Sequence, residues 1–299
     1  FFLEALDSLP LFSDATGSPK HKPRAHVSNA LKVARPTHER PPSEGIRIMS
    51  FKKAAVLLCA LCAAGASLTC AQARELLRVG TEPTFAPFEF LDTKTKEFSG
   101  FDIDLIRAVA DKAGYDVKIL NMGFDALLPA IMTGTIDVVA SGMSITPERA
   151  ERVAFTKPYY QTGLSMLVRK ADAQKFAKFD DLAGRPIAVQ IGTTGADKAK
   201  SIKDAKVTAF NTTSDAFMAL STGSADAVIL DRPVIGYFLK SQPKLAKNLQ
   251  LQPAMEDAAS FGFAVKKDNT ALLEKLNKAY DELEASGEAR KIFEKWFAE

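Results

Sequence analysis

Short apolar segments alternate with longer amphipathic segments along residues 74–299. The short segments consist mostly of Val, Ile, Leu and Ala, which predicts buried strands, whereas the longer ones place apolar residues on one helical face. This alternation predicts an α/β protein, and about 226 residues suffice for two lobes. We expect strands at 76–80, 117–119, 136–140, 164–168, 186–190, 207–210, 227–230 and 261–265, and helices at 102–113, 196–201, 234–240, 270–285 and 288–297.

One arrangement occurs twice in the sequence. Residues 125–139 and 215–229 each contain an apolar helix, a Thr-Gly pair, an Asp three residues after the glycine, and a hydrophobic strand. The glycine suits the position just after a helix end, and Asp137 and Asp226 stand at the entry to short buried strands. The repeat predicts two halves of similar construction.

The stretch S-G-M-S-I-T-P-E-R, residues 141–149, combines a helix start with a cation. Thr146 is a suitable N-cap and Pro147 suits the first helical position, so a helix begins soon after the preceding strand. The free N–H groups and the dipole of a helix start attract anions, and Arg149 adds a bidentate donor. This pattern predicts a carboxylate site; the alternative is an ordinary capped helix with a surface arginine.

Each half of the repeat is followed by one charged residue near the carboxyl end of a strand. Arg149 follows the strand at 136–140, and Asp231 follows the strand at 227–230. Open α/β sheets bind their ligands at the carboxyl ends of the strands. One cation and one anion in such positions match a zwitterion, with Arg149 for a carboxylate and Asp231 for an ammonium group.

Residues 49–73 have the three parts of a secretory signal. A basic start at 49–53 precedes an apolar run at 54–68 and the small-x-small site A-Q-A, so we expect cleavage after Ala73 and secretion of the mature protein. The apolar run is shorter than the roughly 18 residues of a membrane span. Lipid attachment at Cys70 is a less favoured alternative, because the third residue upstream of that cysteine is not leucine.

The cysteines and histidines fall outside the predicted mature protein. Residues 1–48 precede a plausible initiator methionine, and we interpret them as a leader or artefact without a core of its own. All three cysteines and all three histidines precede residue 74. Residues 74–299 therefore offer no disulfide, no Cys or His metal ligand, no Ser-His-Asp triad and no cysteine nucleophile. We expect neither a metal nor a cofactor.

The charge balance argues against nucleic acid as a partner. Residues 1–73 contain nine of the 39 Lys and Arg residues and five of the 36 Asp and Glu residues, which leaves 30 basic and 31 acidic side chains beyond them. A nearly neutral protein of this kind lacks the basic footprint of a nucleic-acid-binding domain.

These motifs resemble those of the periplasmic amino-acid-binding proteins of ABC importers, in the group for polar amino acids. The resemblance covers residues 76–298 and implies a two-lobed clamshell with hinge strands near 160–164 and 256–260. It places lobe 1 at 74–161 plus 259–299 and lobe 2 at 162–258. The matching motifs are G-T-E-P-T-F-A-P-F-E-F (80–90), G-F-D-I-D-L (100–105), S-G-M-S-I-T-P-E-R, F-T-K-P-Y-Y (155–160), V-Q-I-G-T-T-G (189–195) and D-A-V-I-L-D (226–231).

The resemblance also implies how the backbone of an amino acid is bound. Arg149 is expected to bind the carboxylate together with the backbone N–H groups of Ser144 and Thr194. Asp231, Ser144 and the Gly142 carbonyl are expected to hold the ammonium group.

Four further residues are implied as contacts of the ligand side chain. Phe85 and Phe124 are expected to sandwich it, with Glu82 and Gln190 at its far end. Each has a structural alternative: the aromatic rings as core, Glu82 as a solvated loop acid, and the segment after Gln190 as an ordinary turn. The combination resembles arginine binders more than glutamine binders, so we expect a basic amino acid first and glutamine second.

The predicted function is a periplasmic receptor, monomeric and without catalytic residues, that delivers a free polar or basic amino acid to an inner-membrane ABC permease. One alternative is an enzyme on the same fold that resembles arogenate or prephenate dehydratases, with Glu82 as the candidate general acid. A second alternative is the ligand-sensing module of a signalling receptor. The sequence up to Glu299 contains no spanning helix or catalytic domain for such a receptor, so we expect it least.

Overall fold

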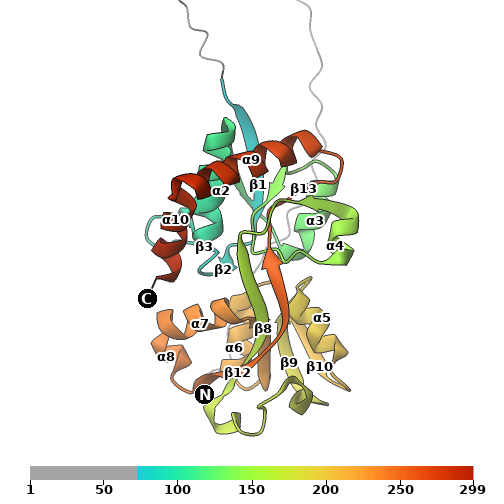
Figure 1. The fold of residues 1–299 in the computed structure, drawn as a ribbon. Coiled ribbons are helices and arrows are strands. Elements are labelled where there is room, and N and C mark those ends of the chain that lie inside the picture. The colour runs from blue at the N-terminus through green and yellow to red at the C-terminus, as the bar shows by residue number, and fades with distance from the viewer. Residues whose placement is uncertain (1–72, 299) are drawn as a thin grey trace, which may run out of the picture. The chain divides into compact units, whose positions relative to one another are not determined.

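A computed structural model describes residues 73–298. The expectations for residues 1–48, the signal sequence and Cys70 lie outside the described residues. Figure 1 shows two lobes, each with a central sheet flanked by helices, and two long strands that run between them. The predicted two-lobed α/β architecture is confirmed.

The first lobe is built on a five-stranded sheet with β1 at the centre of its parallel part. β1 runs parallel to β5 and β6, and β13 runs antiparallel to β6 and β7. The sheet order is β5 (Tyr115–Asn121), β1 (Glu75–Thr81), β6 (Val138–Val139), β13 (Ala264–Lys266) and β7 (Val153–Phe155). The other elements of this lobe are α2 (Phe101–Ala113), α3 (Phe124–Met132), α4 (Pro147–Arg152), α9 (Thr270–Ser286), α10 (Glu288–Phe297), and a small sheet of β2 (Thr84–Phe85), β3 (Glu89–Leu91) and β4 (Phe98–Ser99).

The second lobe repeats the parallel part of the first. β9 lies between β10 and β11 and is parallel to both, as β1 is to β5 and β6. The sheet order is β10 (Lys206–Phe210), β9 (Pro186–Gln190), β11 (Ala227–Asp231), β8 (Tyr160–Arg169) and β12 (Leu249–Phe261). Its helices are η1 (Lys170–Asp172), η2 (Phe179–Leu182), α5 (Thr194–Ser201), α6 (Thr213–Ser221), α7 (Arg232–Ser241) and α8 (Pro243–Ala246).

The two connecting strands are β8 and β12, which pair antiparallel with each other. Their register joins Tyr160 to Phe261 and Leu164 to Glu256, so the pair includes both predicted hinge segments. The register shifts twice along β12, on both sides of Glu256. Such irregularities bend a strand and interrupt its ladder, which suits a connection between lobes.

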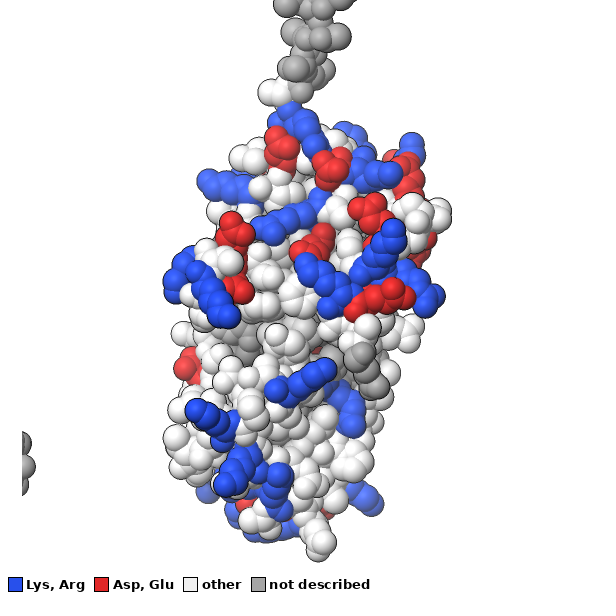
Figure 2. Space-filling model, turned by 90° about the vertical axis from the view of Figure 1, so that its left-hand side faces the viewer, with Lys and Arg blue, Asp and Glu red and all other residues white. Residues whose placement is uncertain are grey.

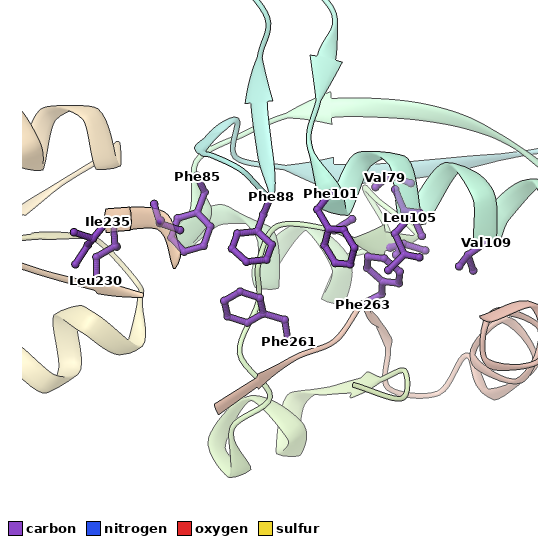
Figure 3. Packing of buried hydrophobic residues seen from close by; sticks show 14 of the residues in the cluster. Val79, Phe85, Phe88, Phe101, Leu105, Val109, Leu230, Ile235, Phe261 and Phe263 are labelled. Atoms are coloured by element: carbon purple, nitrogen blue, oxygen red, sulfur yellow. The ribbon is translucent and has the colours of Figure 1, made fainter. Parts of the chain in front are cut away.

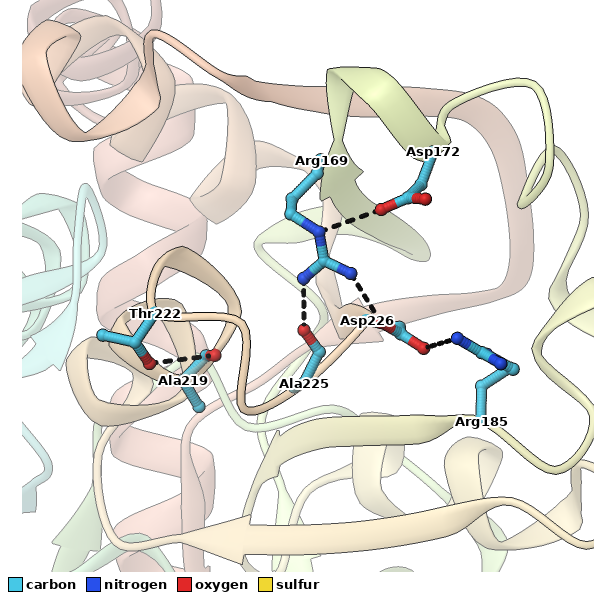
Figure 4. A network of polar contacts seen from close by, with 7 residues as sticks. All are labelled: Arg169, Asp172, Arg185, Ala219, Thr222, Ala225 and Asp226. Atoms are coloured by element: carbon cyan, nitrogen blue, oxygen red, sulfur yellow. Dashed lines mark hydrogen bonds and ion pairs between the residues drawn. The ribbon is translucent and has the colours of Figure 1, made fainter.

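The internal repeat is visible as two matching contacts. In the first lobe Asp137 accepts hydrogen bonds from Arg78, at 2.8 Å from the backbone N and 2.6 Å from Nη2. In the second lobe Asp226 accepts from Arg169 at 2.5 Å and also pairs with Arg185 (Figure 4). Each aspartate thus stands at a strand entry and pairs with an arginine from the neighbouring strand, so these two residues stabilise the sheets.

Aromatic side chains pack in the core of the first lobe, next to the connecting strands. Phe88 lies 6.2 Å from Phe101 and 5.1 Å from Phe261 between ring centroids, and Figure 3 shows this row extending to Phe85. Burying each such ring contributes about 1.5–3 kcal/mol. The packing therefore gives Phe85 a rigid support.

Two predicted strands differ from the structure. The predicted strand 261–265 is divided, because β12 ends at Phe261 and β13 begins at Ala264, where the chain passes from the connecting pair to the first sheet. The predicted strand 136–140 shortens to Val138–Val139, although its flanking residues are buried. In both cases the apolar run consists of buried residues, but only some of these residues form the hydrogen bonds of a β-sheet.

In Figure 2, acidic and basic side chains are intermingled over the first lobe, which is the upper lobe in this view. Over the lower lobe, basic side chains are separated by uncharged surface. No continuous basic stripe crosses the part of this face that the structure describes. Among residues 73–298, no helix combines the length and the apolar character that a membrane crossing requires.

Candidate functional site

The candidate site lies where parallel strands of both lobes end. Glu82 directly follows β1 and Gly142 lies just after β6, while Gln190 and Asp231 are the last residues of β9 and β11. In each lobe the three parallel strands lie side by side so that the first along the chain is flanked by the second and the third. The four residues follow or end the first and the third of these strands, which are neighbours in the sheet. Chain connections leave such neighbouring strands in opposite directions, which opens a crevice at their carboxyl ends.

Arg149 extends from α4 of the first lobe toward the second lobe. Its side chain donates to the Ser144 carbonyl at 2.9 Å and to the Gly192 carbonyl at 3.0 Å. A guanidinium has five N–H groups, so donors remain for a carboxylate. Burial lowers the pKa of Arg149, and nearby acids, including Asp231, oppose that effect. The predicted cap is confirmed, since Thr146 accepts from the Arg149 backbone N–H.

The backbone N–H groups that the prediction assigns to a carboxylate are at Ser144 and Thr194. Ser144 lies opposite Phe261 of β12 in an antiparallel bridge, and the hydrogen bonds of this bridge are made by the residues next to each of the two. The N–H and carbonyl groups of Ser144 itself therefore face away from β12. Thr194 is the first residue of α5, where backbone donors lack partners within the helix. Because α4 has only six residues, its dipole is weak, and Arg149 itself is the main attraction for an anion.

An opening of about 1030 Å³ separates parts of the two lobes near Arg149. Phe124 and Thr194 line it together with Arg149, so three of the predicted residues face one space. The Arg149 guanidinium lies 5.5 Å from the centre of the Phe124 ring, which favours a charged arginine through its cation–π contact.

Asp231 provides the opposite charge and is 5% exposed. Its Oδ1 atom accepts a hydrogen bond from the Thr162 hydroxyl at 3.0 Å. Burial raises the pKa of Asp231 to about 7, against the opposing effects of Thr162 and the Arg149 charge. A cation beside this carboxylate would restore its ionised form, because an opposite charge favours the charged state. Sequence analysis did not identify Thr162, whose place in a connecting strand gave no signal of its contact.

Glu82 and Gln190 meet across the two lobes. The Gln190 Nε2 atom donates to Glu82 Oε2 at 2.8 Å, and the Thr84 hydroxyl donates to the same oxygen at 2.8 Å. No hydrogen bond from another described residue reaches Glu82 Oε1. Burial raises the pKa of Glu82, and the hydrogen bonds from Thr84 and Gln190 oppose that shift. Glu82 is therefore a buried acid whose Oε1 atom accepts no side-chain hydrogen bond from the described residues, and not the solvated loop acid of the alternative interpretation.

Phe85 and Gly142 fit against each other. Gly142 has a φ angle of +50°, and a Cβ atom there would lie 2.8 Å from Phe85 Cε1. The position therefore requires glycine for its backbone conformation and for the close approach of the ring. Phe85 and Phe124 are both buried. Phe85 also belongs to the aromatic core of Figure 3, so the core interpretation holds for part of its surface.

Two buried acids behind the site were not identified from the sequence, although both lie within quoted motifs. Asp102 accepts from the Gly142 backbone N–H at 2.8 Å and from the Tyr159 hydroxyl at 2.6 Å. Glu89 accepts at 3.0 Å from Ser141, whose hydroxyl in turn accepts from the Glu82 backbone N–H.

Burial raises the pKa of both acids, to about 7 for Asp102 and well above the ordinary value for Glu89, where the charge of Asp102 adds to the effect. These acids fix the loop that includes Gly142. The signal that could have found them is an acid placed between apolar residues in F-E-F and G-F-D-I-D-L.

Comparisons with known proteins agree with this architecture. The sequence profile of the family described as bacterial extracellular solute-binding proteins, family 3, matches residues 77–299. The chain is 36% identical over 232 residues to "ABC transporter arginine-binding protein 1" of Escherichia coli K12, covering 76% of this chain and 93% of that protein.

Two solved structures are similar in fold and sequence. One, described as an ancestral arginine-binding protein bound to arginine, has a TM-score of 0.72 at 39% identity and covers 75% of this chain and 99% of its own. The other, described as an ancestral arginine-binding protein bound to glutamine, has a TM-score of 0.70 at 40% identity. It covers 76% of this chain and 99% of its own.

Proposed function

Because the chain belongs to the bacterial extracellular solute-binding proteins, family 3, we propose that it is a periplasmic receptor for a free amino acid, basic first and glutamine second. It would deliver this ligand to an inner-membrane ABC permease and act as a monomer. The relatives named above are an arginine-binding protein of an ABC transporter and arginine-binding proteins that hold arginine or glutamine, which supports this ligand class.

The observation that carries the proposal is the pair of opposite charges at Arg149 and Asp231. The two groups belong to different lobes, are 8% and 5% exposed, and each influences the pKa of the other. A zwitterion supplies a carboxylate to the remaining Arg149 donors and an ammonium group to Asp231. A ligand with only one of these charges would leave the other protein group without its partner, which costs several kcal/mol at a buried site.

The side chain is selected at Glu82. Its Oε1 atom receives no hydrogen bond from the described residues, so a guanidinium or ammonium group can donate to it. Glutamine can donate through its amide, whereas a glutamate or aspartate side chain meets a like charge.

A thermal-shift screen of the twenty amino acids, followed by calorimetric titration, tests this function. We expect arginine or another basic amino acid to bind best, glutamine to follow, and glutamate and aspartate not to bind. Preferred binding of an acidic or aliphatic amino acid would remove Glu82 from its assigned role, and no binding of any amino acid would contradict the receptor function.

The mature protein is proposed to begin at Arg74, after cleavage behind Ala73. Arg74 already contacts the fold, since it donates to Asp111 at 2.7 Å and to the Tyr115 carbonyl at 2.6 Å. Mass analysis of a periplasmic extract should find this N-terminus. A different start, or lipid-modified Cys70 in the membrane fraction, would contradict it.

We propose that the two lobes, with boundaries at 161/162 and 258/259, close on the ligand, and that no chemical step follows. The matched relatives are named as binding proteins, which supports a receptor over the dehydratase alternative at the level of the family.

A further inference from the structure

Thr84 and Thr213 join the two lobes outside the nine predicted residues. Thr84 lies in β2 of the first lobe, and Thr213 is the first residue of α6 in the second. The Thr213 backbone N–H donates to Thr84 Oγ1 at 3.2 Å, and the Thr213 hydroxyl donates to the Thr84 carbonyl. Thr213 is 1% exposed and Thr84 is half-buried, so these contacts are partly shielded from water.

The direction of these hydrogen bonds determines what Thr84 does for Glu82. A hydroxyl group has one proton to donate and two lone pairs to accept with. Because Thr84 Oγ1 accepts from the Thr213 N–H, its proton is available for Glu82 Oε2, which lies 2.8 Å away. The donation favours an ionised Glu82 and holds Oε2, so that Oε1 remains for the ligand.

We propose that Thr84 and Thr213 form an interlobe clasp that positions and ionises Glu82 when the lobes close, which makes Thr84 a specificity-determining residue for basic ligand side chains. The inference rests on the proposed function, in which Glu82 contacts the ligand side chain. Thr84 acts through Glu82 and is a positioning residue. Closure then positions the Glu82 carboxylate for the ligand side chain, because the contacts between Thr84 and Thr213 form only when both lobes are together.

Titration of Thr84→Val and Thr84→Ser with arginine and with glutamine tests the clasp. Valine removes the hydroxyl at nearly constant volume, whereas serine keeps it. We expect Thr84→Val to weaken arginine binding by about ten-fold more than glutamine binding, as for the loss of one hydrogen bond to a charged group. Thr84→Ser should retain the parent preference. Thr208→Val, an exposed threonine of β10 in the second lobe, is the matched control and should change neither affinity.

The pH dependence separates positioning from a general role in closure. Without the Thr84 donor, Glu82 should protonate at higher pH, so Thr84→Val should lose arginine affinity at a higher pH than the parent does. In a Glu82→Gln background, Thr84→Val should no longer change the preference for arginine over glutamine. Equal weakening of both ligands, or an unchanged preference with an unchanged pH profile, overturns the clasp.

The parent protein distinguishes failure of the clasp from failure of the function. If the parent does not prefer basic amino acids, the proposed ligand class is wrong and the clasp with it. If the parent prefers arginine and folded Thr84→Val does so equally, only the clasp is wrong. Should Thr84→Val not fold, as judged by its melting transition, Thr213→Val removes the hydroxyl donor from the other lobe. It should also lower the preference for arginine, and an unchanged preference overturns the clasp.

Discussion

Arg149 donates a hydrogen bond across the cleft to the carbonyl oxygen of Gly192, over 3.0 Å. Gly192 has a φ angle of +76°, and a Cβ atom there would lie 3.2 Å from the Asp125 backbone. A side chain at this position would be strained and would press against the opposite lobe. The same arginine that is proposed to bind the ligand carboxylate therefore also contacts the second lobe, which supports the proposed coupling of binding to closure.

Loss of either end of the zwitterion clamp should abolish tight binding. Arg149→Ala or Asp231→Asn should each weaken arginine binding by about 2–5 kcal/mol, the range for truncating one partner of a buried charge pair. Asparagine at 231 can still accept from Thr162, so folding should persist. Arg152→Ala, an exposed arginine on the same helix, is the control. If calorimetry finds that either site variant binds arginine with an affinity within a few-fold of the parent's, that residue lies outside the site.

Arginine affinity should rise between pH 5.5 and pH 8. Burial with the lobes together raises the pKa of Asp231 to about 7, so in this arrangement much of the group is protonated at pH 6 until a cation binds beside it. The ligand ammonium requires the carboxylate, and binding should therefore release a proton. Glu82, whose pKa is also raised, acts in the same direction.

Titration at pH 6 in buffers of different ionisation enthalpy measures that proton release. Asp231→Asn should release fewer protons than the parent. Proton uptake at pH 6, or an affinity that falls as the pH rises over this range, would contradict this account.

The two charged residues of the candidate site were predicted from local chemistry, its other residues were implied by the family resemblance, and the contacts that neither predicted are long-range. Arg149 and Asp231 follow recognisable turn and strand signals, and the repeat around Asp137 indicated two similar halves. Thr84 and Thr213 are 129 positions apart and in different lobes, so no local pattern connects them. The role of Asp102 depends on burial beneath a loop 40 positions away, which packing alone produces.

The buried acid Asp102 should make the ligand-free protein less stable as the pH rises. Its pKa is raised from 3.8 to about 7 in the folded protein, so folding favours the protonated form. That stabilisation is complete below about pH 4 and is lost as the pH rises through 7. We expect the free energy of unfolding to fall by about 1–3 kcal/mol from pH 5 to pH 8, with Asp231 adding to the same trend.

Asp102→Asn should reduce this dependence and raise stability at pH 8 relative to the parent, because asparagine still accepts from Gly142 and Tyr159 without a buried charge. Denaturant unfolding at both pH values measures the effect. Asp180→Asn, an exposed acid of the second lobe, should leave the pH dependence as it is. A parent protein that is more stable at pH 8 than at pH 5 contradicts the prediction.

Ligand binding should favour the compact arrangement of the lobes. Arg149 and Asp231 come from different lobes, so one ligand satisfies both only when the lobes are together. Small-angle scattering should give a smaller radius of gyration with saturating arginine than without it. Arg149→Ala should show no such decrease at the same arginine concentration. An unchanged radius of the parent, with binding confirmed by calorimetry, would argue against closure as the mode of capture.

Glu82→Gln should change which amino acid the protein prefers. A buried carboxylate without a cationic or hydrogen-bonding partner costs several kcal/mol, and arginine supplies both kinds of contact. Glutamine at position 82 keeps an acceptor for Thr84 and Gln190 but loses the charge, so arginine should lose about ten-fold or more in affinity and free glutamine much less. Glu97→Gln, an exposed acid of the same lobe, is the control and should leave both affinities unchanged. Titration of the three proteins with both amino acids decides the matter: if Glu82→Gln weakens arginine and glutamine equally, the carboxylate does not recognise the ligand's charge.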